Sequence, residues 1–301
     1  MVASPIMAKY GYHVRSTSLP SASHPLTARV EEELNKLRGW MMDSKPSLLN
    51  TTMVLQDGFG GLIRLFERVE DLLQLSHTQQ LLLQHRNEKC VDKVLDESLR
   101  LVDVCGTAKD ALLRMKEHVQ QTQSGLRRRR SEFDLTNEVD TYQFSRRKVN
   151  KAILKSIGEL KKMESKHPSS LLEKDQDLVA LVTVLREVEA TTLFVCESLL
   201  SFLLGSRTLQ KRRGWSLVSK LMHRKIITCE EQHEDVNQVE MVHTAILALK
   251  NHKCHEVKIP QNAQIQLEAL EASIGNLEVE LECIFKKLIK TRVALLNIFS
   301  S

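Results

Sequence analysis

The fold is decided by residues 88 to 127, which read EKCVDKVLDESLRLVDVCGTAKDALLRMKEHVQQTQSGLR. Apolar or small side chains recur there at alternating intervals of three and four: Val91, Val94, Ser98, Leu101, Cys105, Ala108, Leu112, Met115, Val119, Thr122 and Leu126. This spacing follows one face of an α-helix over five heptads. The stretch therefore predicts one helix of roughly 60 Å, at about 1.5 Å per residue.

The C-terminal part of the chain repeats this pattern. Its seam consists of Leu267, Leu270, Ile274, Leu277, Leu281, Ile284, Leu288, Thr291, Leu295 and Ile298. Beyond residue 284 a second apolar stripe appears, formed by Phe285, Ile289, Leu296 and Phe299. An apolar arc that widens in this way indicates packing by more than one neighbour. We expect this last helix to belong to the core.

Shorter amphipathic segments accompany the two long helices. We expect helices over residues 26–41, 47–75 and 138–164, and short ones over 215–222 and 229–250, followed by a polar linker ending at Pro260. The run from Asp57 to Gly61, with three glycines, predicts a kink or turn within the second of these.

The most apolar stretch, from Leu178 to Leu204, predicts a buried core helix, with Ser170 as a candidate N-terminal cap. It is interrupted by four charged residues: Arg186, Glu187, Glu189 and Glu197. A membrane span needs about 18 to 20 apolar residues, and no uncharged window of that length exists in this stretch.

These patterns together predict an all-α protein, an elongated antiparallel helical bundle with two long heptad-seamed helices. We expect residues 26–301 to form this single domain and residues 1–25, rich in Ser and free of acidic residues, to be a disordered tail. Aromatic residues make up only 4% of the chain, which disfavours a β-sandwich. An intermolecular coiled coil is the rival interpretation, although the apolar positions exceed a bare two-per-heptad seam.

The charge balance and the cysteines indicate a soluble protein of a reducing compartment. The formal charge of +5 mixes 43 cations with 38 anions, a balance that favours solubility without implying nucleic acid. The six cysteines are scattered and no secretory signal precedes them. We expect an intracellular, cytoplasmic location, with plastid or nucleus as alternatives.

No motif of catalysis stands out, so the sequence predicts that the chain is not an enzyme and holds no cofactor. Residues 58–61 lack the Lys-Ser/Thr of a phosphate-binding loop, and neither GxSxG nor HExxH occurs. Zinc could be held by Cys and His residues late in the chain, but their spacing is irregular: Cys229, His233, His252, Cys254 and His255.

Three basic clusters lie at residues 127–130, 146–148 and 211–213. They could contact the phosphates of nucleic acid or anionic lipid, or the first two could direct nuclear import. No interleaved aromatic set or RNA-binding signature accompanies them. We therefore expect solvated helix ends and loops, and we disfavour nucleic acid and anionic lipid as partners.

The N-terminal tail contains a candidate docking motif, Arg15-Ser16-Thr17-Ser18-Leu19-Pro20. It has the R-S-x-S-x-P form of the phosphoserine peptides that 14-3-3 proteins bind. A phosphate on Ser18 could meet an arginine cluster through charge-assisted bonds, while Pro20 turns the peptide away. Arg15, Ser16, Ser18 and Pro20 are thus the predicted partner-binding residues. A cleaved transit peptide is the alternative.

Ten segments match a family pattern: 12–16 (YHVRS), 18–20 (SLP), 24–25 (HP), 30–34 (VEEEL), 69–75 (VEDLLQL), 98–105 (SLRLVDVC), 108–110 (AKD), 126–130 (LRRRR), 216–222 (SLVSKLM) and 288–298 (LIKTRVALLNI). In these the chain resembles a plant-specific family of unknown function related to the BYPASS proteins. The resemblance implies a role in root and shoot development, with no known activity or catalytic residue. Ser76-His77 replaces the proline that relatives often carry, and the family's usual start aligns with Met7, so translation could begin at Met1 or Met7.

The hypothesis is therefore a non-enzymatic helical interaction or regulatory protein of plant root and shoot development. The alternative is a peripheral protein whose basic clusters contact anionic membrane or nucleic acid. Salt dependence separates them, because phosphate contacts weaken steeply with ionic strength and apolar helix docking does not.

Overall fold

The computed structural model describes residues 25–43, 51–128, 132–164, 175–205, 237–251 and 258–300, which fold into helices and contain no strand. These helices are α1 (Pro25–Asp43), α2 (Thr51–Leu73), α3 (Ser76–Gln84), α4 (Lys89–Arg128), α5 (Glu132–Glu164), α6 (Gln176–Leu204), α9 (Gln238–Asn251) and α10 (Lys258–Ser300). The all-α prediction is confirmed.

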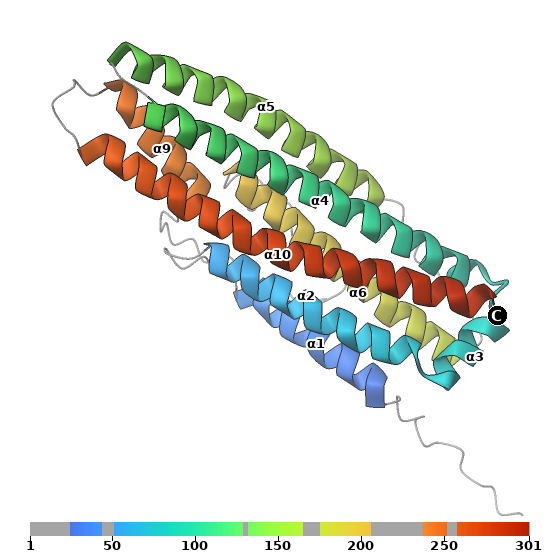
Figure 1. Ribbon diagram of the computed structural model, residues 1–301. Helices are drawn as coiled ribbons and strands as arrows, with labels where there is room; N and C mark the ends of the chain where they lie inside the picture. Colours follow the sequence, from blue (N-terminus) through green and yellow to red (C-terminus); the bar gives the residue numbers. More distant parts are fainter. Residues whose placement is uncertain are drawn as a thin grey trace, which may run out of the picture.

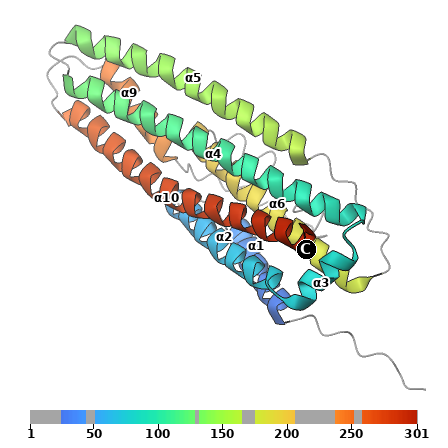
Figure 2. The same ribbon diagram turned by 45° about the vertical axis from the view of Figure 1, so that its right-hand side comes forward.

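The helices form an elongated bundle in which α4 and α10 run side by side along its length (Figure 1). α10 also packs against α2 and α9, and α4 packs against α5 and α6. α1 lies against α2 and α6, so it covers the bundle on the side away from α5. Figure 2 shows the same arrangement after a 45° turn, with α5 at the outer edge.

The two long seams are buried as predicted. Every seam position from Val91 to Leu126 in α4, and every one from Leu267 to Ile298 in α10, lies in the core. The second stripe of α10 is different. Phe285 and Phe299 are partly buried against the core, whereas Ile289 and Leu296 are each 41% exposed. The prediction that more than one neighbour packs this helix into the core is confirmed, because α4, α2 and α3 all contact α10, while no described helix covers the outermost positions of the second stripe.

Ion pairs between α4 and α10 show the direction and register of the two helices. Lys109 pairs with Glu282, Lys116 Nζ lies 2.5 Å from Glu278 Oε2, and Arg127 Nη2 lies 3.2 Å from Glu268 Oε1. Residue numbers rise along α4 as they fall along α10, so the two helices are antiparallel. Such partly exposed pairs each contribute about 0.2 to 1 kcal/mol, and the buried seam contributes far more.

The predicted kink in the second helix is absent, because α2 continues unbroken from Thr51 to Leu73. Its glycines serve close packing against α1 instead. A Cβ atom on Gly58 would lie 2.6 Å from Cζ2 of Trp40, and one on Gly61 would lie 2.5 Å from Cδ2 of Leu37. Glycine costs a helix about 1 kcal/mol relative to alanine. Burial of the neighbouring Phe59 and of other α2 side chains outweighs that cost.

The core helix α6 is buried as predicted, but its N-terminal cap is Asp175. Asp175 Oδ1 accepts the backbone N–H groups of Asp177 at 2.9 Å and Leu178 at 3.2 Å, which satisfies two donors that the first turn leaves free. Ser170, the predicted cap, lies outside the described residues. Gly205 closes the helix with a φ of 75°, a conformation that favours glycine.

Two other boundaries differ from prediction. α5 begins at Glu132 instead of residue 138, and α10 begins at Lys258, so Pro260 stands in its first turn. Proline fits there because the first N–H groups of a helix have no partner within it. The helix predicted over 215–222 lies outside the described residues. No described helix has both the length and the hydropathy needed to cross a membrane.

Close packing of α1 on α2 predicts opposite effects for two Gly→Ala substitutions. Gly58→Ala should destabilise the protein by about 1 to 3 kcal/mol, because the new methyl group displaces the rigid Trp40 ring. That shift also strains the bond from Trp40 Nε1 to the carbonyl oxygen of Val54, 2.8 Å long. Gly275→Ala, in open space on α10, should stabilise by about 0.4 to 1 kcal/mol.

Urea unfolding followed by circular dichroism measures both variants. Equal stabilisation by the two substitutions would show that Gly58 does not mediate close helix contact.

Candidate functional site

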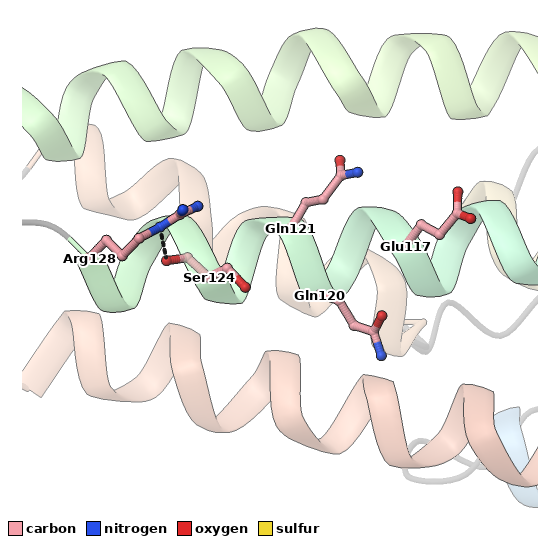
Figure 3. A pocket seen from close by; sticks show the side chains of 5 residues that line it. All are labelled: Glu117, Gln120, Gln121, Ser124 and Arg128. Carbon is pink, nitrogen blue, oxygen red and sulfur yellow. Dashed lines mark hydrogen bonds between the residues drawn. The ribbon is translucent and has the colours of Figure 1, made fainter.

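One pocket among the described residues is an open polar depression on α4 (Figure 3). Its lining side chains all come from that helix: Glu117, Gln120, Gln121, Ser124 and Arg128. Arg128 Nε donates to the carbonyl oxygen of Ser124 at 3.1 Å, and Gln120 Nε2 donates to Glu271 of α10 at 2.8 Å. Ligand sites are usually concave and mostly apolar. This depression therefore has little of the character of a small-molecule or cofactor site.

The most unusual chemistry lies between α4 and α6, where two buried carboxyl groups meet two half-buried arginines. We call this group the α4–α6 ionic cluster: Glu97, Arg100, Arg186 and Glu189. Arg100 Nη2 donates to Glu189 Oε1 at 3.0 Å and lies 3.8 Å from Glu97 Oε1. Arg186 Nε lies 3.8 Å from the same Glu97 oxygen. Glu97 and Glu189 are only 6% and 4% exposed. Two carboxyl groups and two guanidinium groups thus share one interior space.

Burial changes the protonation of both carboxyl groups. It raises the pKa of Glu97 above its ordinary value, against the opposing effect of Arg186 and Arg100. Burial, together with the nearby charge of Glu97 and against the opposing charges of Arg100 and Arg186, raises the pKa of Glu189 to about 7. Near neutral pH the Glu189 carboxyl group is therefore present in both its protonated and its ionised form. A carboxyl group with such a pKa occurs at active sites and also in structural ion-pair networks.

The charges of α6 connect four helices. Each of the four charged residues that interrupt its apolar sequence forms an ion pair with another helix. Arg186 pairs with Glu97 and Glu189 with Arg100, both on α4. Glu187 pairs with Arg38 of α1, and Glu197 pairs with Lys161 of α5. The sequence showed these four residues only as interruptions. A buried charge needs a partner, so their presence in the most apolar stretch was the available signal, but it did not name the partners.

A second buried group joins α4, α5 and α9. The rings of His118, Tyr142 and His243 follow one another, with centroids 5.0 Å and then 5.7 Å apart. Tyr142 Oη lies 3.2 Å from His243 Nδ1, and His118 Nδ1 lies 3.0 Å from Ser145 Oγ. Burial, with Arg146 nearby, lowers the pKa of His118 to about 4, so this ring is neutral at pH 7. Burial also raises the pKa of Tyr142 to about 12.

Arg146 belongs to this interior and not to a surface basic cluster, as the sequence had suggested for residues 146–148. It is 5% exposed, and it donates to the carbonyl oxygens of Leu203 at 3.2 Å and Leu204 at 3.0 Å. These are carbonyls at the C-terminal end of α6, where the helix dipole favours a cation. Arg147 and Lys148 remain exposed. Of the first cluster, Arg127 and Arg128 are exposed. The cluster at 211–213 lies outside the described residues.

The described cysteines are thiols of the interior or its edge. Cys90, Cys105 and Cys196 are buried and Cys283 is partly buried, and none of these four forms a disulfide. Burial raises the pKa of Cys196 to about 12 and also raises that of Cys105, so both stay protonated and pack as small apolar groups. Within the described ranges no group of three or more potential ligands is placed to hold a metal ion.

Two groups discussed from the sequence fall on residues that the structure does not describe. One is the candidate docking motif, with Arg15, Ser16, Ser18 and Pro20, which stays a prediction. The other is the set of Cys and His residues near 229–233 and 252–255, for which the irregular spacing disfavours zinc.

The fold and its clusters define a helical-bundle protein whose buried ionisable groups link helices. The family model described as Protein BPS1 matches residues 58–298, and the chain belongs to this family. The resemblance to the BYPASS-related plant proteins is thereby confirmed. Membership places the chain among proteins related to plant development, and their molecular function is unknown. No curated protein and no solved structure matches the chain.

The raised pKa of Glu189 predicts how the Glu189→Gln variant responds to pH. A folded pKa of about 7 against an ordinary 4.5 means that the wild-type carboxyl contributes stability below pH 4.5 and loses it as pH rises to 7. Glutamine does not titrate. The difference in unfolding free energy between variant and wild type should shift by about 3 kcal/mol in favour of the variant between pH 4.5 and pH 8.

Urea unfolding at both pH values measures this shift. Glu268→Gln is the matched control, because Glu268 lies at the surface beside Arg127 and burial contributes little there. The wild-type curve itself includes an opposite contribution from His118, whose lowered pKa costs stability as pH falls from 6.5 to 4. Comparing variant with wild type cancels that contribution. A difference for Glu189→Gln that did not change with pH would contradict the predicted pKa.

Proposed function

We propose that this chain is a non-enzymatic helical interaction or regulatory protein of plant root and shoot development, and that it acts by binding other proteins. Family membership supports the developmental context. The buried ionisable groups support the non-enzymatic part, because they connect helices and do not converge on the described pocket. The observation that carries the proposal is a set of uncovered aliphatic side chains on α10.

We call this set the α10 outer stripe: Val279, Ile289, Val293 and Leu296. Their exposed fractions run from 41% to 71%. The last three are spaced by four and three residues, so they share one face of the helix, away from its buried seam. In both overall views α10 lies toward the viewer, with no described helix in front of it (Figures 1 and 2). Aliphatic groups gathered on one face, with a polar rim, are typical of interaction surfaces.

The occupant that fits this stripe is an amphipathic helix of a partner protein with an aliphatic face and acidic flanks. Lys286 and Lys290 adjoin Ile289, and their side chains are each 73% exposed. Their pairs with Glu282 and Glu70 span 3.6 Å and 3.3 Å, so carboxylates on a partner can compete for them. The aliphatic contacts supply affinity in such a complex, and the rim charges mainly accelerate association.

The double variant Val293→Asp/Leu296→Asp tests the stripe in plants that lack this chain. Its matched control is Leu113→Asp/Leu99→Asp on α4, because the exposures of Leu113 and Val293 are both 48% and those of Leu99 and Leu296 are 43% and 41%. Wild type and control should restore root and shoot growth and label the same neighbouring proteins in quantitative proximity labelling. With the stripe variant, the labelling of the most strongly labelled proteins should fall at least tenfold, and growth should not be restored.

Circular dichroism of the purified variants establishes that both still fold. Full restoration of growth by the stripe variant would refute the stripe as the working surface. Equal failure of both folded variants would refute it too, because the effect would not be specific to α10.

We propose a 14-3-3 protein as one such partner, bound through phosphorylated Ser18. The support is the sequence Arg15-Ser16-Thr17-Ser18-Leu19-Pro20. A phosphate adds nearly two negative charges, and charge-assisted bonds are roughly twice as strong as neutral ones. Calorimetry with a peptide of residues 11–24 should give binding at least tenfold tighter when Ser18 is phosphorylated, and an Arg15→Ala substitution should weaken it. Equal affinity of the two forms would exclude this partner.

A further inference from the structure

The outer face of α5 combines cations with uncovered apolar side chains. We define the α5 basic face as Phe144, Arg147, Lys148, Lys151, Leu154 and Lys155. At 3.6 residues per turn these six positions fall within an arc of roughly 120°. All six side chains are exposed, and the exposed fractions of Phe144 and Leu154 are 61% and 50%. α5 packs against α4, α6 and α9 on its other side, and it lies at the outer edge of the bundle (Figures 1 and 2).

This face carries unbalanced positive charge. Between residues 144 and 158 the chain has no acidic residue. Asp140 and Glu159 bound the face, and each already has a cation: Asp140 lies 2.9 Å from Lys250 Nζ and Glu159 lies 3.8 Å from Lys155 Nζ. Within the described part of the chain, Arg147, Lys148 and Lys151 form no salt bridge. The Lys148 ammonium group lies 4.3 Å from the centroid of the Phe144 ring.

The pairing of charge with apolar side chains selects among anionic partners. Single-stranded nucleic acid is held by series of stacking aromatics beside cations, and this face has one aromatic ring. A bilayer surface has lipid phosphates that attract cations and an adjacent acyl boundary that accepts apolar side chains. Phe144 and Leu154 lie on the same face as the cations, so apolar side chains could enter the acyl boundary while the cations contact the phosphates. An outermost helix can also meet a flat surface without obstruction from the other described helices.

We propose that the α5 basic face docks this protein onto the surface of an anionic phospholipid bilayer. Arg147, Lys148 and Lys151 meet the lipid phosphates, and Phe144 and Leu154 enter the boundary beneath them. The inference goes beyond the proposed protein-binding function, and it uses a different face from the α10 outer stripe. The sequence had assigned this cluster to a solvated surface, because it did not show which side chains of α5 stay uncovered.

Vesicle flotation with the full chain tests the proposal. Vesicles of phosphatidylcholine with 30% phosphatidylserine should bind the protein, vesicles of phosphatidylcholine alone should not, and added salt should weaken binding. The variant Arg147→Gln/Lys148→Gln/Lys151→Gln should bind on the order of 100-fold more weakly, since each cation near an anionic surface contributes roughly a fivefold effect. Phe144→Gln/Leu154→Gln should lose binding at unchanged net charge, which separates insertion from simple adsorption.

The matched control is Arg29→Gln/Arg86→Gln/Arg114→Gln, which removes the same charge from exposed positions away from α5 and from the α10 outer stripe. It should keep most of the binding, and circular dichroism should show that every variant folds. Absence of binding to the anionic vesicles would overturn the proposal, as would equal losses in the α5 and control triple variants. Tighter binding to single- or double-stranded oligonucleotides than to vesicles, lost in the same α5 variant, would assign the face to nucleic acid instead.

Discussion

The antiparallel packing of α4 against α10 is the contact on which the other helices depend. Each helix has 40 or more residues, and a helix of that length in water is held mainly by burial of its apolar face. The seams bury each other over most of that length, and truncating a buried leucine in such a seam typically costs about 2 to 5 kcal/mol. α2 and α9 then use further faces of α10, and α5 and α6 use further faces of α4. One long pair therefore supports both sides of the bundle.

The charges of α6 impose a different constraint. An apolar helix packs in many rotational and sliding positions at similar energy, whereas a buried charge is tolerated only where its partner stands. Glu189 is buried and meets Arg100 of α4, while Glu187 and Glu197 are partly exposed and meet Arg38 of α1 and Lys161 of α5. The net stability from such pairs is small, because desolvation offsets the attraction. The pairs match the observed arrangement of four helices, and the raised pKa of Glu189 follows from its burial there.

With the interior occupied in this way, the surfaces that remain available are the outer faces of the peripheral helices. Those of α10 and α5 differ in kind: the first is aliphatic with a lysine rim, and the second is cationic with two apolar side chains. They belong to different helices, and α5 makes its main contacts with α4, α6 and α9. Under the two proposals, this protein holds a partner helix and an anionic bilayer on separate faces. Membership of a family related to plant development agrees with that kind of role without assigning a molecular activity.

The sequence by itself determined the features that depend on local periodicity. The all-α class, the extent of α4, the burial of the seams of α4 and α10 and the buried nature of α6 all follow from apolar spacing along one segment. Tertiary structure decided whatever depends on a neighbour from elsewhere in the chain. Three glycines in α2 predict a break by propensity, yet the approach of α1 makes two of them part of the packing.

The candidate site shows the same division. Glu97 and Glu189 are 92 residues apart, and no local pattern states that they share Arg100 in the interior. Arg146 and Arg147 are adjacent and chemically identical, but one caps α6 inside the bundle and the other faces solvent. The physical reason is that apolar burial follows a repeat readable along one helix, whereas pairing and exposure depend on how separate helices rotate against each other.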